Sequence, residues 1–198
     1  MRKTISAALG ISMLLVLMFF YHGNQNEGTF WQTVDMVEFY LRDNGTDSTF
    51  IGTVFVQTNG DFKRVLLVGW INITESDVSG AVVSVPQGWK ITSWSTSYRD
   101  RTFTNISKWI SVLVASDPTW PAKYHVYIGP AGYDPFFCRN HSCGGGVGNI
   151  FIELVPEKNS KNLTLNVGVG STFKYMKDGR KVLVAPVTYK NITILLKE

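Results

Sequence analysis

The stretch "TFIGTVFVQTNGDFKRVLLVGWINIT", residues 49–74, contains two runs of β-branched and aromatic residues that are separated by a turn. The turn, residues 58–62, is built on Asn59-Gly60, a dipeptide typical of a tight β-hairpin. The second run, Lys63 to Thr74, is apolar at both odd and even positions. We therefore expect its strand to lie centrally in the core of the fold.

The same alternation of short strands and turns continues along the chain. In "NLTLNVGV", residues 162–169, apolar residues alternate with Thr, Asn and Gly, as in a half-buried strand. The segment Phe30–Asp43 fits either a helix or a strand, and its β-branched and aromatic content favours a strand. Further strands are expected in "GAVVSV" (80–85), "KITSWSTSY" (90–98), "KWISVLVAS" (108–116), "KYHVYIG" (123–129), "NIFIELV" (149–155), "KVLVAPV" (181–187) and "NITILL" (191–196).

These ten or so strands, with no convincing amphipathic helix after Gly28, predict an all-β fold. An antiparallel β-sandwich is favoured over a barrel, because the expected strands vary in length and one long loop interrupts them. No internal repeat or linker divides this region. Residues 24–198 are therefore expected to form one domain.

A short region, Ala81 to Gly129, resembles a known class of module. "VVSVPQGWKITS" and the later "YHVYIG" resemble immunoglobulin-like modules of prokaryotic surface proteins and carbohydrate-active enzymes. The resemblance implies an immunoglobulin-like sandwich and a location outside the cell. It transfers no catalytic residue to this chain.

The first 23 residues have the features of a membrane segment. The charged residues Arg2 and Lys3 precede an uncharged run, Thr4 to Tyr21, of 18 residues, which as a helix would span about 27 Å, enough for a bilayer core. The run ends in bulky residues, Phe19-Phe20-Tyr21, where a signal peptidase would need small ones. The pattern favours an uncleaved transmembrane signal-anchor over a cleaved signal peptide. Residues 24–198 would then lie outside the cytoplasm, or be secreted if cleavage occurs.

The charge distribution argues against nucleic-acid binding. The net charge of the 198-residue chain is +4, and it falls to +2 without Arg2 and Lys3. A nucleic-acid partner requires a clustered basic face, and this charge is weak and dispersed.

Six Asn-x-Ser/Thr sequons occur, which is more than this composition leads us to expect by chance. Several fall in turns or at polar positions of expected strands, where a glycan could face solvent. The alternative is that Asn and Thr simply favour such positions. The candidate glycosylation sites are Asn44, Asn72, Asn105, Asn140, Asn162 and Asn191.

No motif of a hydrolase, metalloprotease or P-loop enzyme is present, and the sequence predicts no cofactor and no catalytic residue. The stretch "DPFFCRNHSCGGGVG", residues 134–148, contains both cysteines. A disulfide between Cys138 and Cys143 is favoured, since an even count outside the cytoplasm fits one. The alternatives are a metal site formed by Cys138, His141 and Cys143 with His125 or Asp134, and a redox pair.

From Gly129 to Gly148 the sequence shows little strand signal, so the loop that carries these cysteines is long, which is typical of functional loops. Its aromatic residues and hydrogen-bonding groups suit a binding tip formed by Tyr133, Phe136, Phe137, Arg139 and His141. Alternatively, the two phenylalanines pack on the sandwich edge, and the glycine run allows another backbone to approach closely.

Trp89, Trp94, Trp109 and Trp120 suggest sugar stacking, but at least three of them are expected in the core or at its edge. Trp120, between Pro118 and Pro121, is the one most expected to be exposed, and it is grouped with the loop residues as a candidate binding residue.

These features predict a membrane-anchored, extracytoplasmic β-sandwich that acts as a non-catalytic binding or scaffolding module of the cell envelope. Its partners would be the membrane and an envelope protein or glycan. The alternative is an envelope metal-binding or redox protein that uses Cys138, His141 and Cys143.

Overall fold

The computed structural model describes residues 30–44, 47–73, 80–100, 110–117, 119–129, 145–157, 160, 162–170, 173–175, 181–183 and 188–196. The chain divides into two compact units, Met1–Trp31 and Gln32–Glu198. All strands belong to the second unit. Within the described ranges no helix is long and apolar enough to cross a membrane, and the uncharged run Thr4–Tyr21 lies outside them.

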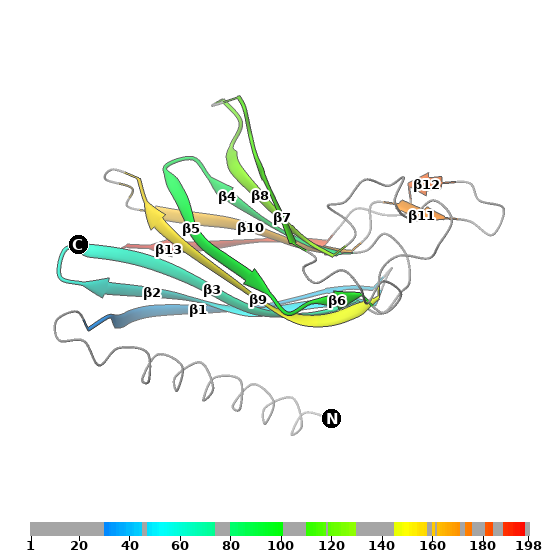
Figure 1. The fold of residues 1–198 in the computed structure, drawn as a ribbon, viewed down its shortest axis with the longest axis horizontal. Coiled ribbons are helices and arrows are strands. Elements are labelled where there is room, and N and C mark those ends of the chain that lie inside the picture. Colours follow the sequence, from blue (N-terminus) through cyan, green and yellow to red (C-terminus); the bar gives the residue numbers. More distant parts are fainter. Residues whose placement is uncertain are drawn as a thin grey trace, which may run out of the picture. The chain divides into compact units, whose positions relative to one another are not determined.

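Two antiparallel sheets make up the fold (Figure 1). In sheet A the strands follow the order β1-β2-β3-β9-β5, and β6 pairs with β9. Its strands are β1 (Gln32–Asp43), β2 (Ser48–Asn59), β3 (Phe62–Ile73), β5 (Trp89–Thr96), β6 (Arg99–Asp100) and β9 (Gly146–Pro156).

Sheet B has the order β13-β10-β4-β8-β7. Its strands are β4 (Gly80–Pro86), β7 (Ile110–Val114), β8 (Ala122–Ile128), β10 (Asn162–Gly170) and β13 (Thr188–Leu195). A separate two-stranded ribbon pairs β11 (Phe173–Tyr175) with β12 (Lys181–Leu183). The prediction of an all-β, antiparallel, sandwich-like fold is confirmed for the described residues.

The hairpin predicted at Asn59-Gly60 forms between β2 and β3. Asn59 pairs with Phe62, and Gly60 adopts a φ of 58°, in the left-handed region that the tight turn needs. Strand β3 lies in the middle of sheet A, between β2 and β9. Val65, Leu66 and Leu67 are all buried, so apolar residues of both parities are covered. The ambiguous segment before this hairpin is also a strand, β1, which pairs with β2.

The core lies between the facing sides of the two sheets. Alternate residues of β10, namely Leu163, Leu165, Val167 and Val169, are fully buried, as the alternation predicted. Facing side chains of β2, β3 and β9 complete the same cluster. Trp89, at the start of β5, is also in the core, and its indole Nε1 donates a hydrogen bond to the Asn162 carbonyl at 3.1 Å.

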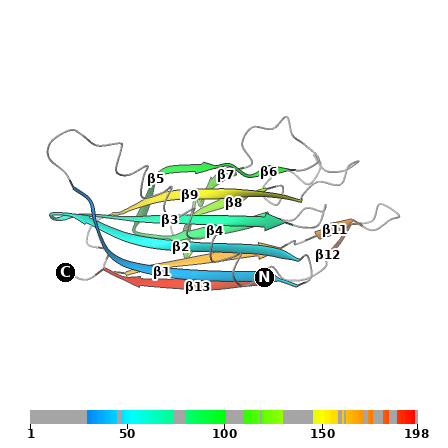
Figure 2. The ribbon, with the colours of Figure 1, turned by 90° about the horizontal axis from the view of Figure 1, so that it is seen from below.

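The two sheets approach each other along one side and diverge along the other. β1 and β13 lie close together (Figure 2), and Thr188 Oγ1 donates a hydrogen bond to the buried Asp43 Oδ1 at 3.0 Å. On the other side, the β7–β8 hairpin rises away from β5 and β9 (Figure 1). Val114 and Trp94 are therefore 63% and 47% exposed, although both lie on the core-facing parity of their strands.

The glycine run after the cysteines belongs in part to a strand. The sequence predicted little strand structure between Gly129 and Gly148, but β9 begins at Gly146. A Cβ on Gly148 would overlap the backbone of Tyr98, whose side chain is buried. Two residues of this run, Gly146 and Gly148, therefore allow another backbone to approach closely, which is the role that the alternative interpretation of this loop expected for the glycines.

We predict that Gly148→Ala lowers the free energy of unfolding by about 2 kcal/mol or more, because the added methyl has no space and the backbone at Tyr98 must move. Urea denaturation of the purified protein measures this change. Gly60→Asn is the control, because the β2–β3 turn has open space and Asn tolerates a positive φ. An unchanged midpoint for Gly148→Ala would contradict the close packing of Tyr98.

Candidate binding surfaces

The strand directions define two ends of the sandwich. The start of β1 and the β2–β3, β4–β5 and β7–β8 turns lie at one end, which we call the hairpin end. The long segments that follow β5 and β8 start from the opposite end, which we call the loop end. Features that are close in sequence can therefore lie at opposite ends of the domain.

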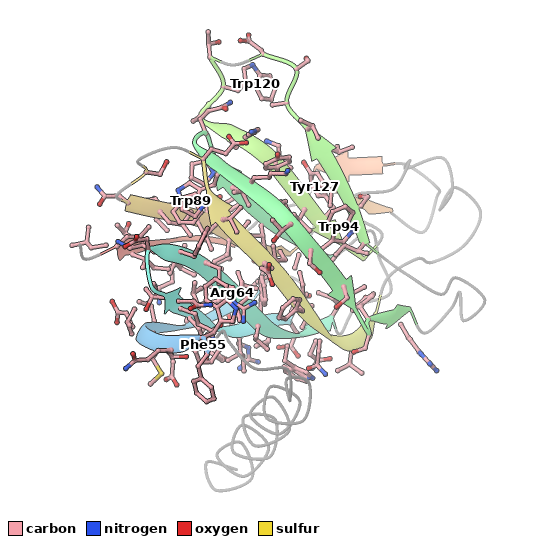
Figure 3. All side chains as sticks on the ribbon, turned by 60° about the vertical axis from the view of Figure 1, so that its left-hand side comes forward. Phe55, Arg64, Trp89, Trp94, Trp120 and Tyr127 are labelled. Atoms are coloured by element: carbon pink, nitrogen blue, oxygen red, sulfur yellow. The ribbon has the colours of Figure 1, made fainter. Side chains whose placement is uncertain are left out.

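The predicted binding tip and Trp120 are separated in this way. Trp120 lies in the β7–β8 turn at the hairpin end (Figure 3). Strand β8 then runs the length of sheet B before the cysteine loop starts at the loop end. The prediction grouped Trp120 with the loop residues, and the structure places it apart from where that loop begins, because a whole strand intervenes.

The loop residues themselves lie outside the described part of the chain. These are Tyr133, Phe136, Phe137, Cys138, Arg139, His141 and Cys143. The loop connects β8 of sheet B to β9 of sheet A. The binding tip, the disulfide and the metal alternative stay predictions for these residues.

The turn that presents Trp120 is held by hydrogen bonds. The Asp117 carboxylate accepts bonds from the Thr119 backbone N–H at 2.8 Å and from its hydroxyl at 2.7 Å. Gln87 Nε2, from the neighbouring turn, donates to the Trp120 carbonyl at 3.3 Å. Trp120 is 56% exposed, which confirms the prediction that this tryptophan reaches solvent.

The other tryptophans have different environments. Trp89 is buried, Trp94 is half-exposed on the edge strand β5, and Trp109 lies outside the described residues. Trp94 is placed by a bulge between Ile91 and Ser93, which shifts the strand register. A single sequence carries no clear signal for that shift.

Sequence reasoning missed a larger surface on the outer side of sheet A. The strand register places a set of apolar side chains together on this side, away from the core. Met36, Tyr40 and Trp70 are 50%, 55% and 38% exposed. We call the following set the aromatic face: Met36, Tyr40, Ile51, Phe55, Leu66, Val68, Trp70 and Phe151.

Leu66 shows how dense the aromatic face is. Its side chain points away from the core, yet it is only 1% exposed. Phe55 and Glu153 lie directly opposite it on the neighbouring strands. The sequence did carry a signal for this face, because β3 is apolar at both odd and even positions. That pattern was taken only as evidence that the strand lies centrally in the sheet.

A row of polar groups borders the aromatic face toward the hairpin end. Arg64, labelled in Figure 3, lies in this row. Its Nε donates to Gln57 Oε1 at 2.9 Å, and its Nη1 lies 3.4 Å from Glu153 Oε2. Gln57 donates onward to Thr33, and Thr92 donates to Glu153. Partial burial lowers the pKa of Arg64, and the Glu153 carboxylate opposes that shift. The row joins all five long strands of sheet A.

The outer side of sheet B has a different chemistry. Tyr189 on β13 lies opposite Gly168 on β10, and a Cβ on that glycine would be 2.5 Å from the tyrosine ring. The ring therefore lies over the glycine, and it is 55% exposed. Val82 and Tyr127 continue the same row. We call Tyr189, Gly168, Val82 and Tyr127 the tyrosine strip.

Two observations support close packing within the tyrosine strip. Val82 points outward but is only 8% exposed. The pKa of Tyr189 is raised by partial burial and, to a smaller extent, by Tyr127. The two tyrosines therefore flank Val82 and shield it from water.

A polar row runs beside the tyrosine strip. Asn166 Nδ2 donates to Asn191 Oδ1 at 2.8 Å, and the Ser84 hydroxyl and His125 Nδ1 are 2.9 Å apart. His125, offered as a metal ligand in the alternative reading of the sequence, is thus engaged with Ser84. No cluster of three metal-ligating side chains occurs among the described residues.

The described sequons differ in exposure. Asn44, Asn162 and Asn191 are exposed, whereas Asn72 on the central strand β3 is half-buried. Asn162 and Asn191 lie on the outward parity, as predicted. Asn105 and Asn140 are outside the described residues.

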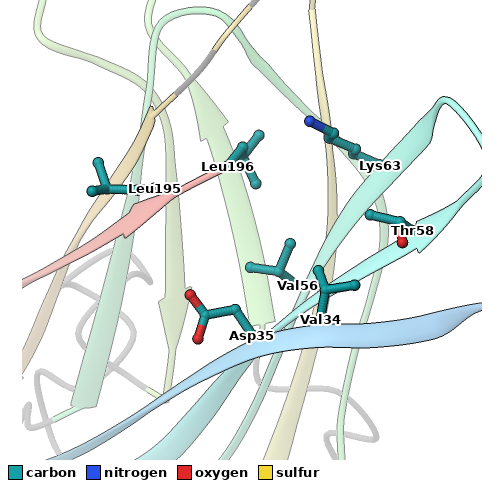
Figure 4. Close-up of a pocket in the computed structure, with 7 residues that line it drawn as sticks. All are labelled: Val34, Asp35, Val56, Thr58, Lys63, Leu195 and Leu196. Carbon is teal, nitrogen blue, oxygen red and sulfur yellow. The ribbon is translucent and has the colours of Figure 1, made fainter. Parts of the chain in front are cut away.

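A small cavity of about 40 Å³ lies at the hairpin end between β1, β2 and the end of β13 (Figure 4). A volume of this size holds a water molecule or two and excludes an organic ligand. Its lining residues are Val34, Asp35, Val56, Thr58, Lys63, Leu195 and Leu196.

A scan against models of protein families finds no match, and a search of curated proteins finds none either. Among solved structures, the chain is similar to the collagen-binding domain of the Erysipelothrix rhusiopathiae surface protein RspB, at 11% identity and a TM-score of 0.34, over 87% of this chain and 58% of that one. It therefore spans less than two thirds of that structure.

Two further similarities are of the same order. One is to a collagen-binding domain from a Staphylococcus aureus adhesin, at 11% identity and a TM-score of 0.34, over 66% of this chain and 87% of that one. The other is to the KRT10-binding region domain of the pneumococcal serine rich repeat protein PsrP, at 12% identity and a TM-score of 0.36, over 80% and 100%. Similarity of this extent is no evidence that this chain binds the ligands of those proteins.

We predict that the Asp117 carboxyl titrates below its ordinary pKa, because the Thr119 hydroxyl and backbone N–H stabilise its charged form. Because the folded-state pKa is lowered, the charged carboxylate stabilises the turn at any pH above the pKa of Asp117 in the unfolded chain. This contribution is lost as the pH falls through the folded-state pKa. NMR titration of the carboxyl measures it. Thr119→Val should raise the pKa partway, and an identical titration in both proteins would show that the hydroxyl contributes nothing.

Proposed function

We propose that this chain is a non-catalytic binding or scaffolding module of the cell envelope. Residues 1–23 would hold it at the membrane, and residues 24–198 would form its extracytoplasmic domain. The observation that carries the proposal is the aromatic face of sheet A, where Tyr40 and Trp70 are exposed beside half-buried apolar residues. Its partner would be another envelope protein.

The aromatic face departs from what a solvated sheet surface needs. An antiparallel sheet that faces water on one side normally alternates apolar residues inward with polar residues outward. On sheet A the outward parity also carries Met36, Phe55 and Phe151. Glu38 and Thr53 interrupt the aromatic face on β1 and β2. Its apolar rows join on β3 through Leu66, Val68 and Trp70. Apolar surface that spans several strands is typical of interaction sites, whereas single scattered apolar residues are not.

The geometry of this face favours binding. Its side chains stand on paired strands, so little backbone conformational entropy is lost when a partner docks. Aromatic residues are enriched among those that dominate binding energy. The polar row through Gln57, Arg64 and Glu153 borders the face as a rim of satisfied hydrogen bonds, which resembles the anatomy of protein interfaces.

The other parts of the proposal come from the sequence. The uncharged run Thr4–Tyr21 supports a membrane anchor, and the lack of a recognisable catalytic motif supports a role without catalysis. The loop residues from Tyr133 to His141 would add a second contact at the loop end. The alternative role of Cys138, His141 and Cys143 stays a prediction, because these residues lie outside the described part of the chain.

We predict that photo-crosslinking from the aromatic face captures one partner. Benzoylphenylalanine replaces Tyr40 or Trp70 in the full-length chain in its native membrane. Irradiation should give the same discrete, higher-mass product from both positions, because the two residues lie in the same cross-strand row. Immunoblotting detects the product, and mass spectrometry identifies it.

Leu195 is the matched control position. It is 61% exposed but lies on the outer side of sheet B. The proposal expects no such product from this position. Equal products at all three positions would indicate nonspecific contact, and no product at Tyr40 and Trp70 would refute binding through the aromatic face.

A further inference from the structure

We propose that Asn191 carries an N-linked saccharide and that the sugars nearest the linkage pack on the ring of Tyr189. The occupant of the tyrosine strip would be this covalently attached glycan. The inference goes beyond the proposed function, because it concerns the opposite sheet and a different kind of ligand.

The spacing of the two residues places them side by side. Residues two apart on a strand point to the same face, and Tyr189 and Asn191 both lie on the outward side of β13. β13 is an edge strand of sheet B, and both side chains are exposed. A saccharide linked to Asn191 would therefore start directly beside the tyrosine ring.

The asparagine amide is oriented for the linkage. Its Oδ1 accepts a hydrogen bond from Asn166 Nδ2 at 2.8 Å. That bond fixes the amide through its oxygen and turns Nδ2, the atom that bears an N-linked glycan, away from Asn166. Thr193 provides the hydroxyl residue of the sequon Asn191-Ile192-Thr193.

The tyrosine strip matches a saccharide chemically. The Tyr189 ring lies over Gly168 and offers an exposed face on which the C–H groups of a pyranose can pack. Ser84 and Asn166 lie in the adjoining row and can hydrogen-bond sugar hydroxyls. Tyr189 and Tyr127 are three strands apart, about 14 Å at usual strand spacing, which gives room for more than one sugar.

The structure distinguishes this sequon from a second one with the same spacing. Trp70 and Asn72 are also two residues apart on one face. However, Asn72 is half-buried on the central strand β3, between Thr49 and Val147. A glycan needs a freely accessible amide, so we infer that Asn72 is unmodified and that the aromatic face stays open to a partner.

The linkage requires a saccharide that is activated as a phosphate ester at its anomeric carbon. Asn191 Nδ2 attacks the anomeric carbon, and the new N–C bond replaces the C–O bond to phosphate. The phosphate leaves with the bonding electron pair, and Nδ2 loses one proton to a base of the transferring enzyme. No oxidation or reduction occurs.

The first test is mass spectrometry of peptides from the full-length protein purified from its native source. The peptide that contains Asn191 should be heavier by the mass of a saccharide, and the peptide that contains Asn72 should have its unmodified mass. An unmodified Asn191 would overturn the proposal. A modified Asn72 would overturn the inference that burial on β3 protects that site.

The second test separates packing on Tyr189 from simple attachment. Tyr189→Ala is compared in the natural protein and in Asn191→Gln, which has no glycan. With the glycan present, we expect the melting temperature to fall by roughly 2 °C more than without it, as an aromatic contact of about 1 kcal/mol would give.

Tyr40→Ala is the matched control, because Tyr40 is 55% exposed like Tyr189 but lies on sheet A. Its effect should be the same with and without Asn191→Gln. If Tyr189→Ala also has equal effects in both backgrounds, the ring serves only to cover Gly168 and Val82, and the packing proposal fails. The melting-temperature comparison does not depend on the proposed function. A failure of crosslinking from the aromatic face would therefore not affect the test of the glycan.

Discussion

The position of β3 between β2 and β9 is the constraint on which the rest of sheet A depends. Both edges of this strand are used in backbone hydrogen bonds, so its register sets the registers of its two neighbours. One parity then fills the core with Val65, Leu67 and Ile71. The other parity presents Leu66 and Trp70 to the outside, so core and aromatic face arise from one pairing.

The two outer surfaces of the sandwich differ because their strands differ in composition. Sheet A carries aromatic and branched residues outward, bordered by the ion pair of Arg64 and Glu153. Sheet B carries the tyrosine strip outward, beside a row of amides and hydroxyls that includes Asn166, Asn191 and Ser84. A protein partner on one side and a saccharide on the other would therefore not compete for the same surface.

Local patterns were sufficient for much of the fold. Asn59-Gly60 predicted the hairpin, and the alternation in residues 162–169 predicted which side of β10 is buried. They did not predict the side of the sheet on which Trp94 lies, because a bulge in β5 shifts its register. They also did not predict the close packing of Gly148, because its neighbour Tyr98 is distant in sequence. Trp120 is close in sequence to the cysteine loop, but strand β8 separates its turn from the point at which that loop begins, and proximity in sequence does not show this.

The sequence by itself determined where strands form and which parity of each is apolar, because both follow from residue type and a period of two. Only the tertiary structure decided which apolar residues stay exposed. Leu66 and Trp70 share a parity, yet one is buried and the other is 38% exposed. The physical reason is that exposure depends on the residues opposite in neighbouring strands, and that pairing joins segments far apart in the chain.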